Sequence, residues 1–343
     1  MKAKNIIVTL TFFLLPYCLW GQPGSGTDVT KVGTSSAAFL GIDIGARATA
    51  MGGTFVALAD DISAIYWNPA GIARLGGGEI AFIHTEWLLD TSFDWGAITF
   101  PIAGLGTVGA SITSLTHDDM EITTIEQPDG TGEFFSANDL ALGLTYAISL
   151  TDRFSIGFNG KFIHSKIFNE SANGFGFDVG TLFVTERGFR IGATITNFGP
   201  KMELSGRDLI VLVDIAPEKE ASNDRLVSNL ATGSFDLPLA FRVGVAMDVI
   251  QRENVRWTIA VEGFNPSDNT ESINFGTEYV FRDFASFRFG YKSLFNDDSE
   301  VGITVGGGIR FGMGQERSLH LDYAYADFGR LQDAQRFSLR LEF

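Results

Sequence analysis

Residues 336–343 read RFSLRLEF, a strict alternation of polar side chains with large apolar ones that finishes on a phenylalanine. Successive side chains of a β-strand point to opposite faces, so one face of this segment is wholly apolar and the other is wholly polar. The apolar face carries Phe337, Leu339, Leu341 and Phe343. The segment therefore predicts a strand that separates an apolar medium from a polar one.

The same pattern recurs along most of the chain. From about residue 78 onward, runs of roughly ten residues alternate with period two and close in turns, as the strands of transmembrane β-barrels do. The runs lie at residues 78–86, 92–100, 104–116, 139–150, 153–165, 174–185, 189–197, 239–249, 255–263, 272–281, 284–292, 301–311, 318–326 and 334–343. We therefore predict an all-β fold, a transmembrane β-barrel of about 14 antiparallel strands, an even number.

The connections between the runs alternate in length. Short ones lie at residues 150–153, 186–188, 251–254 and 282–283, and long ones at residues 116–138, 166–173, 198–238, 265–270, 293–300 and 327–333. Outer-membrane barrels have short periplasmic turns and longer external loops. The alternation therefore predicts a place in the bacterial outer membrane, with both termini in the periplasm.

Charge separates the two faces of the predicted strands. Arg242 and Arg288 share one face with other charged residues, and Val243 and Phe287 share the other with apolar residues. Slipping the register by one residue would turn each Arg or Lys near the midplane toward lipid, at about 2–4 kcal/mol. A water-soluble β-sandwich or propeller would also alternate, but its strands usually have only about five or six residues. In a barrel the last strand must pair with the first, because an open edge in lipid leaves backbone groups unsatisfied.

Composition narrows the class of protein further. The chain of 343 residues contains 40 Gly and 31 Phe, and only 19% of its residues are charged, which favours many strands with tight turns. Its formal net charge of -16 argues against nucleic acid as a partner.

The first residues have the pattern of an export signal. Lys2 and Lys4 precede an apolar run at residues 6–15, and small and polar residues follow. This arrangement predicts a secretory signal peptide over residues 1–21. The single cysteine, Cys18, lies inside it, so the mature chain would contain no thiol. No later segment reaches the roughly 18 uninterrupted apolar residues of a transmembrane helix.

The segment before the first predicted strand follows a different rule. Residues 46–59 are rich in small side chains and are interrupted by Gly52 and Gly53, which predicts a broken helix or a turn. A compact segment on the periplasmic side of so wide a barrel is suited to filling its lumen. We therefore predict a small helical plug within residues 22–77 and a barrel over residues 78–343.

Two short helices are expected within the plug. Asp61 can cap a helix over residues 62–66, and Asn68 followed by Pro69 places an N-cap before a proline at the first helical position. The glycines at residues 76–78 are expected to end the second helix and to lead into the first strand.

This segment resembles the amino-terminal region of the PorV/PorQ family, whose barrels are similar in fold to the long-chain fatty-acid transporters of the outer membrane. The matching residues are Gly45, Arg47, Ala48, Met51, Gly52, Gly53, Phe55, Ala57, Asp60, Asp61, Ala64, Tyr66, Trp67, Asn68, Pro69, Ala70 and Gly71. The resemblance implies a fourteen-stranded barrel with an N-terminal hatch. It also implies a role in type IX secretion, in which the barrel binds or shuttles secreted proteins that carry a C-terminal sorting domain. The fatty-acid transporters share the element at residues 68–71, so the resemblance does not separate secretion from uptake.

A candidate plug or gate motif comprises Arg47, Gly52, Gly53, Asp60, Asp61, Asn68, Pro69 and Gly71. One interpretation makes Asp60 and Asp61 a polar gate or an ion contact in the lumen. The favoured interpretation is helix capping and pairing with Arg47 or with lumen arginines, because Asp is common at helix N-termini. Asn68 and Pro69 are interpreted as a rigid cap in preference to a hinge.

No catalytic or metal-binding pattern is present in the sequence. The sequence contains four histidines, His84, His117, His164 and His320. They do not have the spacing of metal ligands, such as H-x-x-x-H. The G-x-S-x-G motif of hydrolases is also absent. We predict no enzyme activity, no metal site and no cofactor.

Two long connections stand out. Residues 116–138 contain six acidic residues and no Lys or Arg, which predicts either a patch for a basic partner or divalent cations, or a solvated loop. The connection at 198–238 contains an apolar run, Leu209, Ile210, Val211, Leu212 and Val213. Long loops are often functional, and this run either extends the neighbouring strands beyond the membrane or forms an external partner-binding site.

Two functional hypotheses follow. The first is a protein-binding component of type IX secretion, and the second is a passive outer-membrane channel for hydrophobic small molecules such as fatty acids. Under both hypotheses the expected partners include outer-membrane lipids and the barrel assembly machinery. The secretion hypothesis adds secreted cargo proteins and other type IX secretion components. The channel hypothesis adds hydrophobic small molecules. Phe337, Leu339, Leu341 and Phe343 form a candidate C-terminal assembly signal, because an aromatic end on an amphipathic strand is typical of barrels delivered to that machinery.

Overall fold

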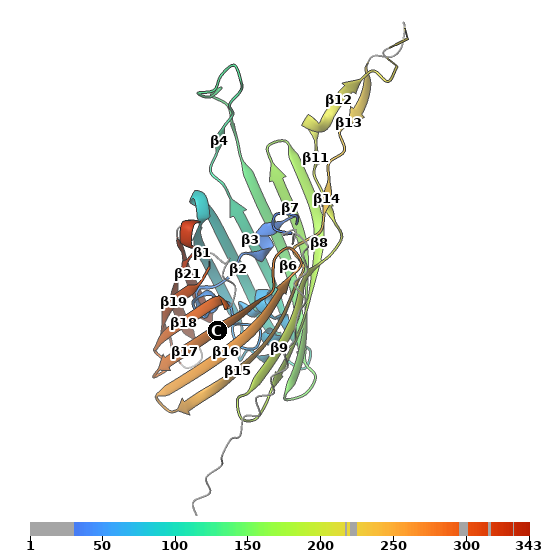
Figure 1. Ribbon diagram of the computed structural model, residues 1–343. Coiled ribbons are helices and arrows are strands. Elements are labelled where there is room, and N and C mark those ends of the chain that lie inside the picture. The colour runs from blue at the N-terminus through green and yellow to red at the C-terminus, as the bar shows by residue number, and fades with distance from the viewer. Residues whose placement is uncertain (1–30, 217, 220–224, 295–300, 315–316, 332) are drawn as a thin grey trace, which may run out of the picture. The chain divides into compact units, whose positions relative to one another are not determined.

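A computed structural model describes residues 31–216, 218–219, 225–294, 301–314, 317–331 and 333–343 (Figure 1). Within these residues, fourteen antiparallel strands form a closed barrel, which confirms the predicted fold class and strand number. The barrel strands are β1 (Glu79–Trp87), β2 (Thr91–Ile102), β3 (Gly106–Thr116), β6 (Ala137–Ser149), β7 (Phe154–Ile167), β8 (Glu170–Val184), β9 (Arg190–Phe198), β15 (Ala240–Arg252), β16 (Val255–Pro266), β17 (Ser272–Phe281), β18 (Ala285–Leu294), β19 (Ile303–Gly312), β20 (Ser318–Asp327) and β21 (Asp333–Glu342).

The first and last strands close the barrel. β1 and β21 pair antiparallel, and the register runs from Glu79↔Glu342 to Glu86↔Gln335. Beyond this register, the N–H of Gly78 donates to Phe343 O and the N–H of Phe343 donates to Gly78 O, both at 2.9 Å. The predicted pairing of the last strand with the first is therefore confirmed, and the seam leaves neither strand with an open edge.

The two faces of the wall differ as the alternation predicts. Arg242 and Arg288 face the lumen and are only 6% and 8% exposed. Val243 and Phe287, one residue away in each case, face outward and are 43% and 65% exposed. A one-residue slip would exchange these environments, so the register is strongly specified.

The wall formed by β1 and β2 departs from this rule. Ile83, Phe93 and Trp95 point inward and are buried in one apolar cluster with residues of the N-terminal segment. Their inward face is apolar because it packs against protein and not against a solvated lumen.

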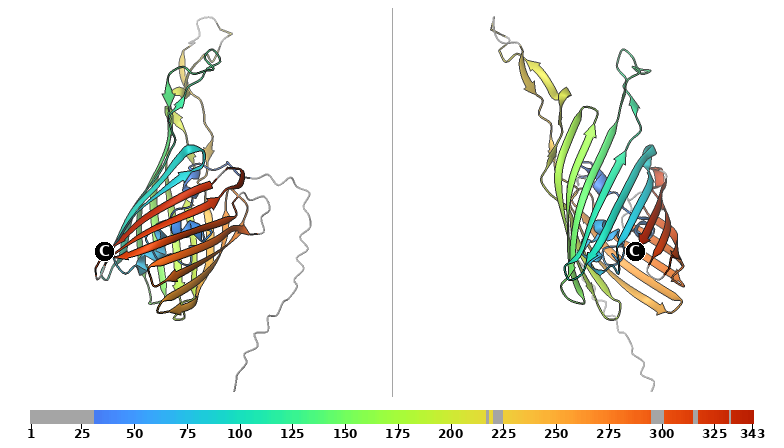
Figure 2. Two further views of the ribbon diagram at one scale, coloured as in Figure 1. Left: turned by 90° about the vertical axis from the view of Figure 1, so that its left-hand side faces the viewer. Right: turned by 180° about the vertical axis from the view of Figure 1, so that it is seen from behind.

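The segment before β1 forms short helical pieces that lie inside the barrel (Figure 2). These are the 3-10 helix η1 (Ala38–Gly41), α1 (Ala46–Ala50), α2 (Ala64–Trp67) and the 3-10 helix η2 (Pro69–Arg74). Helix α1 packs on β18, β19, β20 and β21, and η2 packs on β3, β6, β7 and β8. We refer to residues 38–74 as the plug.

The expected start of the plug helix at residues 62–66 is wrong by two residues. Helix α2 begins at Ala64, and Ser63 at its N-cap makes no side-chain cap bond. Asp61 Oδ1 instead accepts the N–H of Ser63 at 2.9 Å. The Asp61 side chain therefore stabilises a turn before the helix, and the chain enters the helical conformation only afterwards.

The long connections lie at one end of the barrel, the long-loop end, together with the short connections at residues 88–90 and 168–169, and the other short turns lie at the opposite end. The long-loop end carries η3 (Leu88–Asp90), β4 (Met120–Glu121), β5 (Phe134–Phe135), β10 (Met202–Glu203), β11 (Ser205–Gly206), η4 (Arg207–Leu209), β12 (Ile210–Val213), β13 (Leu226–Asn229), β14 (Ser234–Phe235) and η5 (Gly329–Leu331). The long connection expected at residues 166–173 is wrong. Ile167 pairs with Glu170, so the connection is only a two-residue turn. The strands extend further than expected because their backbone pairing continues beyond the residues that alternate between polar and apolar.

None of the helices in the described part of the chain has the length and hydropathy to cross a bilayer. The predicted signal peptide, residues 1–21, lies outside the described residues.

Candidate functional site

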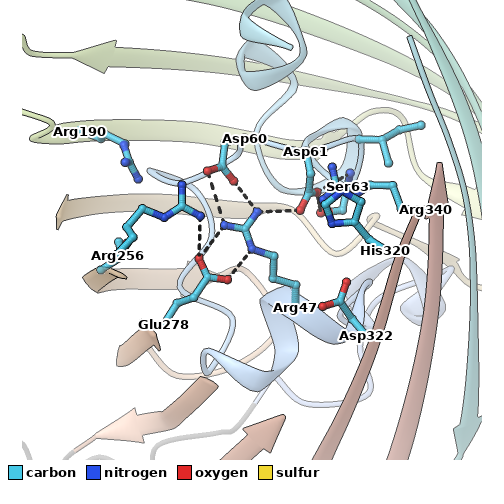
Figure 3. A network of polar contacts seen from close by, with 12 residues as sticks. Arg47, Asp60, Asp61, Ser63, Arg190, Arg256, Glu278, His320, Asp322 and Arg340 are labelled. Atoms are coloured by element: carbon cyan, nitrogen blue, oxygen red, sulfur yellow. Dashed lines mark hydrogen bonds and ion pairs between the residues drawn. The ribbon is translucent and has the colours of Figure 1, made fainter. Parts of the chain in front are cut away.

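Arg47 on α1 is the centre of a network of charged groups between the plug and the wall (Figure 3). Its Nη1 lies 2.6 Å from Asp60 Oδ1 and 3.0 Å from Asp61 Oδ2. Its Nε and Nη2 donate to the two carboxylate oxygens of Glu278 on β17, at 2.8 Å and 2.9 Å. This bidentate contact joins the plug to the wall.

Several arginines of the wall share Glu278. Arg288 Nε lies 2.8 Å from Glu278 Oε1, and Arg256 Nη2 lies 3.6 Å from Glu278 Oε2. Arg288 also lies 2.6 Å from Asp322 on β20. Glu278 is only 1% exposed, so its carboxylate compensates cations that have little access to water.

Asp60 and Asp61 pair with Arg47, which is the favoured interpretation of these two residues from the sequence. Burial would raise the pKa of Asp60, but the charge of Arg47 outweighs it and lowers that pKa from the ordinary value of 3.8. The stabilisation from this pair is therefore fully present above pH 3.8 and is lost as the pH falls through the lowered pKa. At neutral pH the Asp60 carboxyl group is therefore ionised.

Asn68 fixes the second half of the plug. Its Oδ1 accepts the N–H of Ala70 at 3.2 Å, and Pro69 is the first residue of η2, as the capping pattern predicts. Its Nδ2 donates to Val56 O at 2.7 Å and to Thr181 O on β8 at 3.0 Å. One fully buried side chain thus links two parts of the plug to the wall.

Glycines allow the plug backbone to touch the wall. Gly52 has a φ of +67°, and a Cβ at this position would lie 2.8 Å from Phe275 O. On the wall, a Cβ at Gly290 would overlap with Gly52 N, and a Cβ at Gly180 would overlap with Asn68 Oδ1. Since no larger residue fits at these positions, the plug is in direct contact with the strands.

The remaining glycines of the candidate motif serve the fold of the plug itself. Gly53 has a φ of +74°, and a Cβ there would lie 3.3 Å from the Trp67 ring. A Cβ at Gly71 would overlap with Ala59 O, so η2 can lie against the preceding turn only with glycine at this position.

Two parts of this site were not predicted from the sequence. Glu278 is absent from the candidate motif, although the alternation of its strand assigns it to the inward face. Gly180 and Gly290 were also not recognised as contact positions, because the sequence contains 38 other glycines, which lie in turns as well as in strands. Their inward parity was an available signal, but their partners in the plug are far away in the sequence.

Comparison with known proteins identifies the family. Residues 25–209, more than half of the chain, match the family described as Type IX secretion system protein PorV. The chain belongs to the PorV family. This PorV-family chain is therefore one of the outer-membrane β-barrel proteins of type IX secretion.

Solved structures of outer-membrane transporters share the fold of this PorV-family barrel. The toluene transporter TodX of Pseudomonas putida is 13% identical with a TM-score of 0.54, and the alignment covers 87% of this chain and 96% of that chain. The toluene transporter TbuX of Ralstonia pickettii is 13% identical with a TM-score of 0.53, covering 88% of this chain and 98% of that chain. At such identities the similarity shows the fold alone.

A curated relative shares a shorter stretch with this PorV-family chain. A UPF0164 protein of Treponema pallidum is 39% identical over 71 residues, which is 21% of this chain and 17% of that protein. The chain thus matches less than a fifth of the length of this relative.

The apolar run at residues 209–213 lies in a hairpin at the long-loop end of the PorV-family barrel (Figure 1). Leu209 ends η4, and the other four residues form β12, which pairs with β13 and not with β9 or β15. The run therefore does not extend the neighbouring barrel strands. Ile210 and Leu212 on β12 and Val227 on β13 are 50%, 62% and 70% exposed.

The acidic connection at residues 116–138 forms a smaller ribbon, in which β4 pairs with β5. The described residues contain no group of three or more His, Cys, Asp or Glu that could hold a metal ion. His84 lies 2.8 Å from Asp94 across β1 and β2, and His320 contacts Arg340 at 3.0 Å.

Three residues of the candidate assembly signal lie on the outward face of β21, and the fourth, Phe343, directly follows that strand. Phe337, Leu339 and Phe343 are exposed, Leu341 is half-buried, and the ring of Phe343 lies 6.1 Å from that of Phe100. The structure brings these four residues together at the closing strand of the PorV-family barrel.

Proposed function

We propose that this chain is a protein-binding component of type IX secretion, which contacts secreted cargo or a neighbouring translocon protein through its long-loop end. The family supports the secretion role. The observation that carries the binding role is the β12–β13 hairpin, which presents large apolar side chains to solvent.

The hairpin is a small sheet whose outer edges can pair with another strand. β12 and β13 pair over four residues and form a sheet of only two strands. A two-stranded sheet is marginally stable by itself, and each of its strands has an edge that can accept another strand. Burying a side chain such as Leu212 or Val227 contributes about 1.5–3 kcal/mol. A partner that adds a strand or covers these residues would therefore gain affinity from the hairpin.

The proposed orientation places the long-loop end outside the cell. Outer-membrane barrels carry their longer loops there, and the connections at 116–138 and 198–238 both emerge at that end (Figure 1). Phe343 then lies on the periplasmic side, at the short-turn end. A signal peptide at residues 1–21 would deliver the chain to the periplasm.

A passive channel for hydrophobic small molecules is the second candidate. TodX and TbuX, which share the fold, are named toluene transporters. In this chain the plug contacts the wall through its backbone, so passage would require displacement of the plug or a lateral opening. This requirement makes the channel the weaker candidate.

Deletion of residues 205–235 tests the binding role. The full chain, purified in mild detergent, is expected to capture the C-terminal sorting domain of a secreted protein, and the deletion variant is expected to lose it. A second variant that lacks residues 118–134 removes the acidic ribbon instead and should retain capture. Unchanged capture by the 205–235 deletion would refute the role of the hairpin, and copurified acyl chains in the lumen would then favour the channel.

A further inference from the structure

A cavity of about 320 Å³ lies in the lumen at the long-loop end. Its lining includes Leu40 and Asp43 from the plug side, Asn197 near the end of β9 and Pro266 at the end of β16. It does not include Arg47 or Glu278, so it is distinct from the network in Figure 3.

Basic side chains are concentrated in this cavity. Its lining contains four of them, Lys161, Arg242, Lys292 and Arg336. Three have carboxylate partners, in the ion pairs Lys161–Asp178, Arg242–Glu262 and Lys292–Asp43. These three positive charges are therefore compensated within the protein.

Arg336 on β21 is the exception. It is only 1% exposed and forms no ion pair with the described residues. Its Nη1 makes no hydrogen bond, and its Nε donates only a long bond of 3.4 Å to the backbone oxygen of Asp43, whose carboxylate is paired with Lys292. The Asp43 carboxylate attracts Arg336 but also compensates Lys292 and Arg242, so one anion is shared among three cations. Incomplete compensation of a buried cation is unfavourable, so an anion in the adjacent cavity would be attracted.

Aromatic rings form the apolar side of the same cavity. Trp87, Phe264 and Phe328 all line it. The rings of Trp87 and Phe328 pack edge to face at 5.2 Å, and the Arg336 guanidinium lies 5.2 Å from the Trp87 ring centre. The cavity thus combines flat apolar surfaces with one cation that has no ion pair of its own among the described residues.

We propose that this cavity binds a small organic monoanion, whose carboxylate pairs with Arg336 and whose apolar body packs against Trp87, Phe264 and Phe328. Ligand pockets usually measure about 300–1,000 Å³, so this one favours a short acid over a long acyl chain. The half-buried carboxylate of Asp268 also lines the cavity and would repel a second negative charge. The site is independent of the proposed hairpin contact.

Calorimetric titration of the full chain in a nonionic detergent tests the site, with benzoate as the probe and benzyl alcohol as its neutral analogue. Arg336→Gln removes the charge, and Arg336→Lys retains it. Lys201→Gln is the matched control, because Lys201 is an exposed cation that pairs with Asp236 at 3.4 Å outside the cavity. We expect benzoate to bind the wild type and the control alike. Its affinity should fall about tenfold or more in Arg336→Gln and recover in part in Arg336→Lys.

Folding of each variant is checked by heat-modifiable migration on gels. If Arg336→Gln does not fold, Phe264→Leu provides a second variant, which reduces the aromatic surface, keeps the charges and should weaken benzoate binding severalfold. The proposal is overturned if the wild type does not bind benzoate at millimolar concentration. It is equally overturned if benzyl alcohol binds as tightly as benzoate, or if folded Arg336→Gln binds benzoate unchanged.

Discussion

At the scale of single residues, Arg47 and Glu278 join two parts of the chain that lie 231 positions apart. Both partners have little access to water, and Glu278 also compensates Arg288. Without Glu278, Arg47 would keep Asp60 and Asp61 and Arg288 would keep Asp322, but Arg256 would keep no ion pair among the described residues. Leaving buried cations with too few carboxylates costs far more than the intact pairs contribute.

Glu278→Gln should therefore destabilise the barrel by about 3–5 kcal/mol, because it leaves Arg47 and Arg288 without a shared carboxylate. Glu186→Gln is the matched control, since Glu186 pairs with Arg153 while 78% of its side chain is exposed. The control should cost less than about 1 kcal/mol. Equilibrium urea unfolding in detergent micelles, followed by tryptophan fluorescence, measures both, and equal losses would contradict the role of Glu278.

At the scale of secondary-structure elements, alternation located the barrel strands. β17 spans Ser272–Phe281, the residues expected from the sequence. Alternation failed at the turn between β7 and β8, where the polar residues His164 and Lys166 follow Phe162 on the outward face while backbone pairing continues. Alternation also does not predict the structure of the plug, because the positions of its short helices depend on caps, on glycines and on contacts with the wall.

The strand β21 carries the candidate assembly signal, which we propose acts during insertion. The double variant Phe343→Ala with Leu341→Ser should reach the folded, heat-modifiable form more slowly, because the closing strand loses part of its apolar face. Phe311→Ala with Ile309→Ser is the matched control on β19, where both residues face outward and are 43% and 42% exposed. Equal assembly rates for the two double variants in membrane fractions would argue against a signal in β21.

At the scale of the whole barrel, the plug connects opposite walls. Ile65 packs in one apolar cluster with Trp95 on β2 and Ile163 on β7, and Trp67 packs in another with Ala260 on β16. Close packing of this kind leaves little space for water or ions to pass. The lumen is therefore expected to be sealed near these clusters.

Deletion of residues 46–72 should open the barrel to ions. We expect little current for the full chain in planar bilayers and a steady ionic current for this variant, because the remaining lumen face is polar and charged. The variant that lacks residues 205–235 is the control and should stay closed. Comparable currents from the full chain and the 46–72 deletion would show that the plug does not seal the lumen.

The alternation along the chain is enough to predict the barrel, because a pattern with period two has only one register that keeps arginines away from lipid. The sequence also predicts the capping of η2 by Asn68, which depends on neighbours in the chain. Long-range packing, which no local pattern encodes, brings Glu278 to Arg47, sets Gly290 against Gly52 and leaves Arg336 beside a cavity with no ion pair of its own among the described residues. These contacts join residues hundreds of positions apart, and closure of the barrel around the plug is what brings them together.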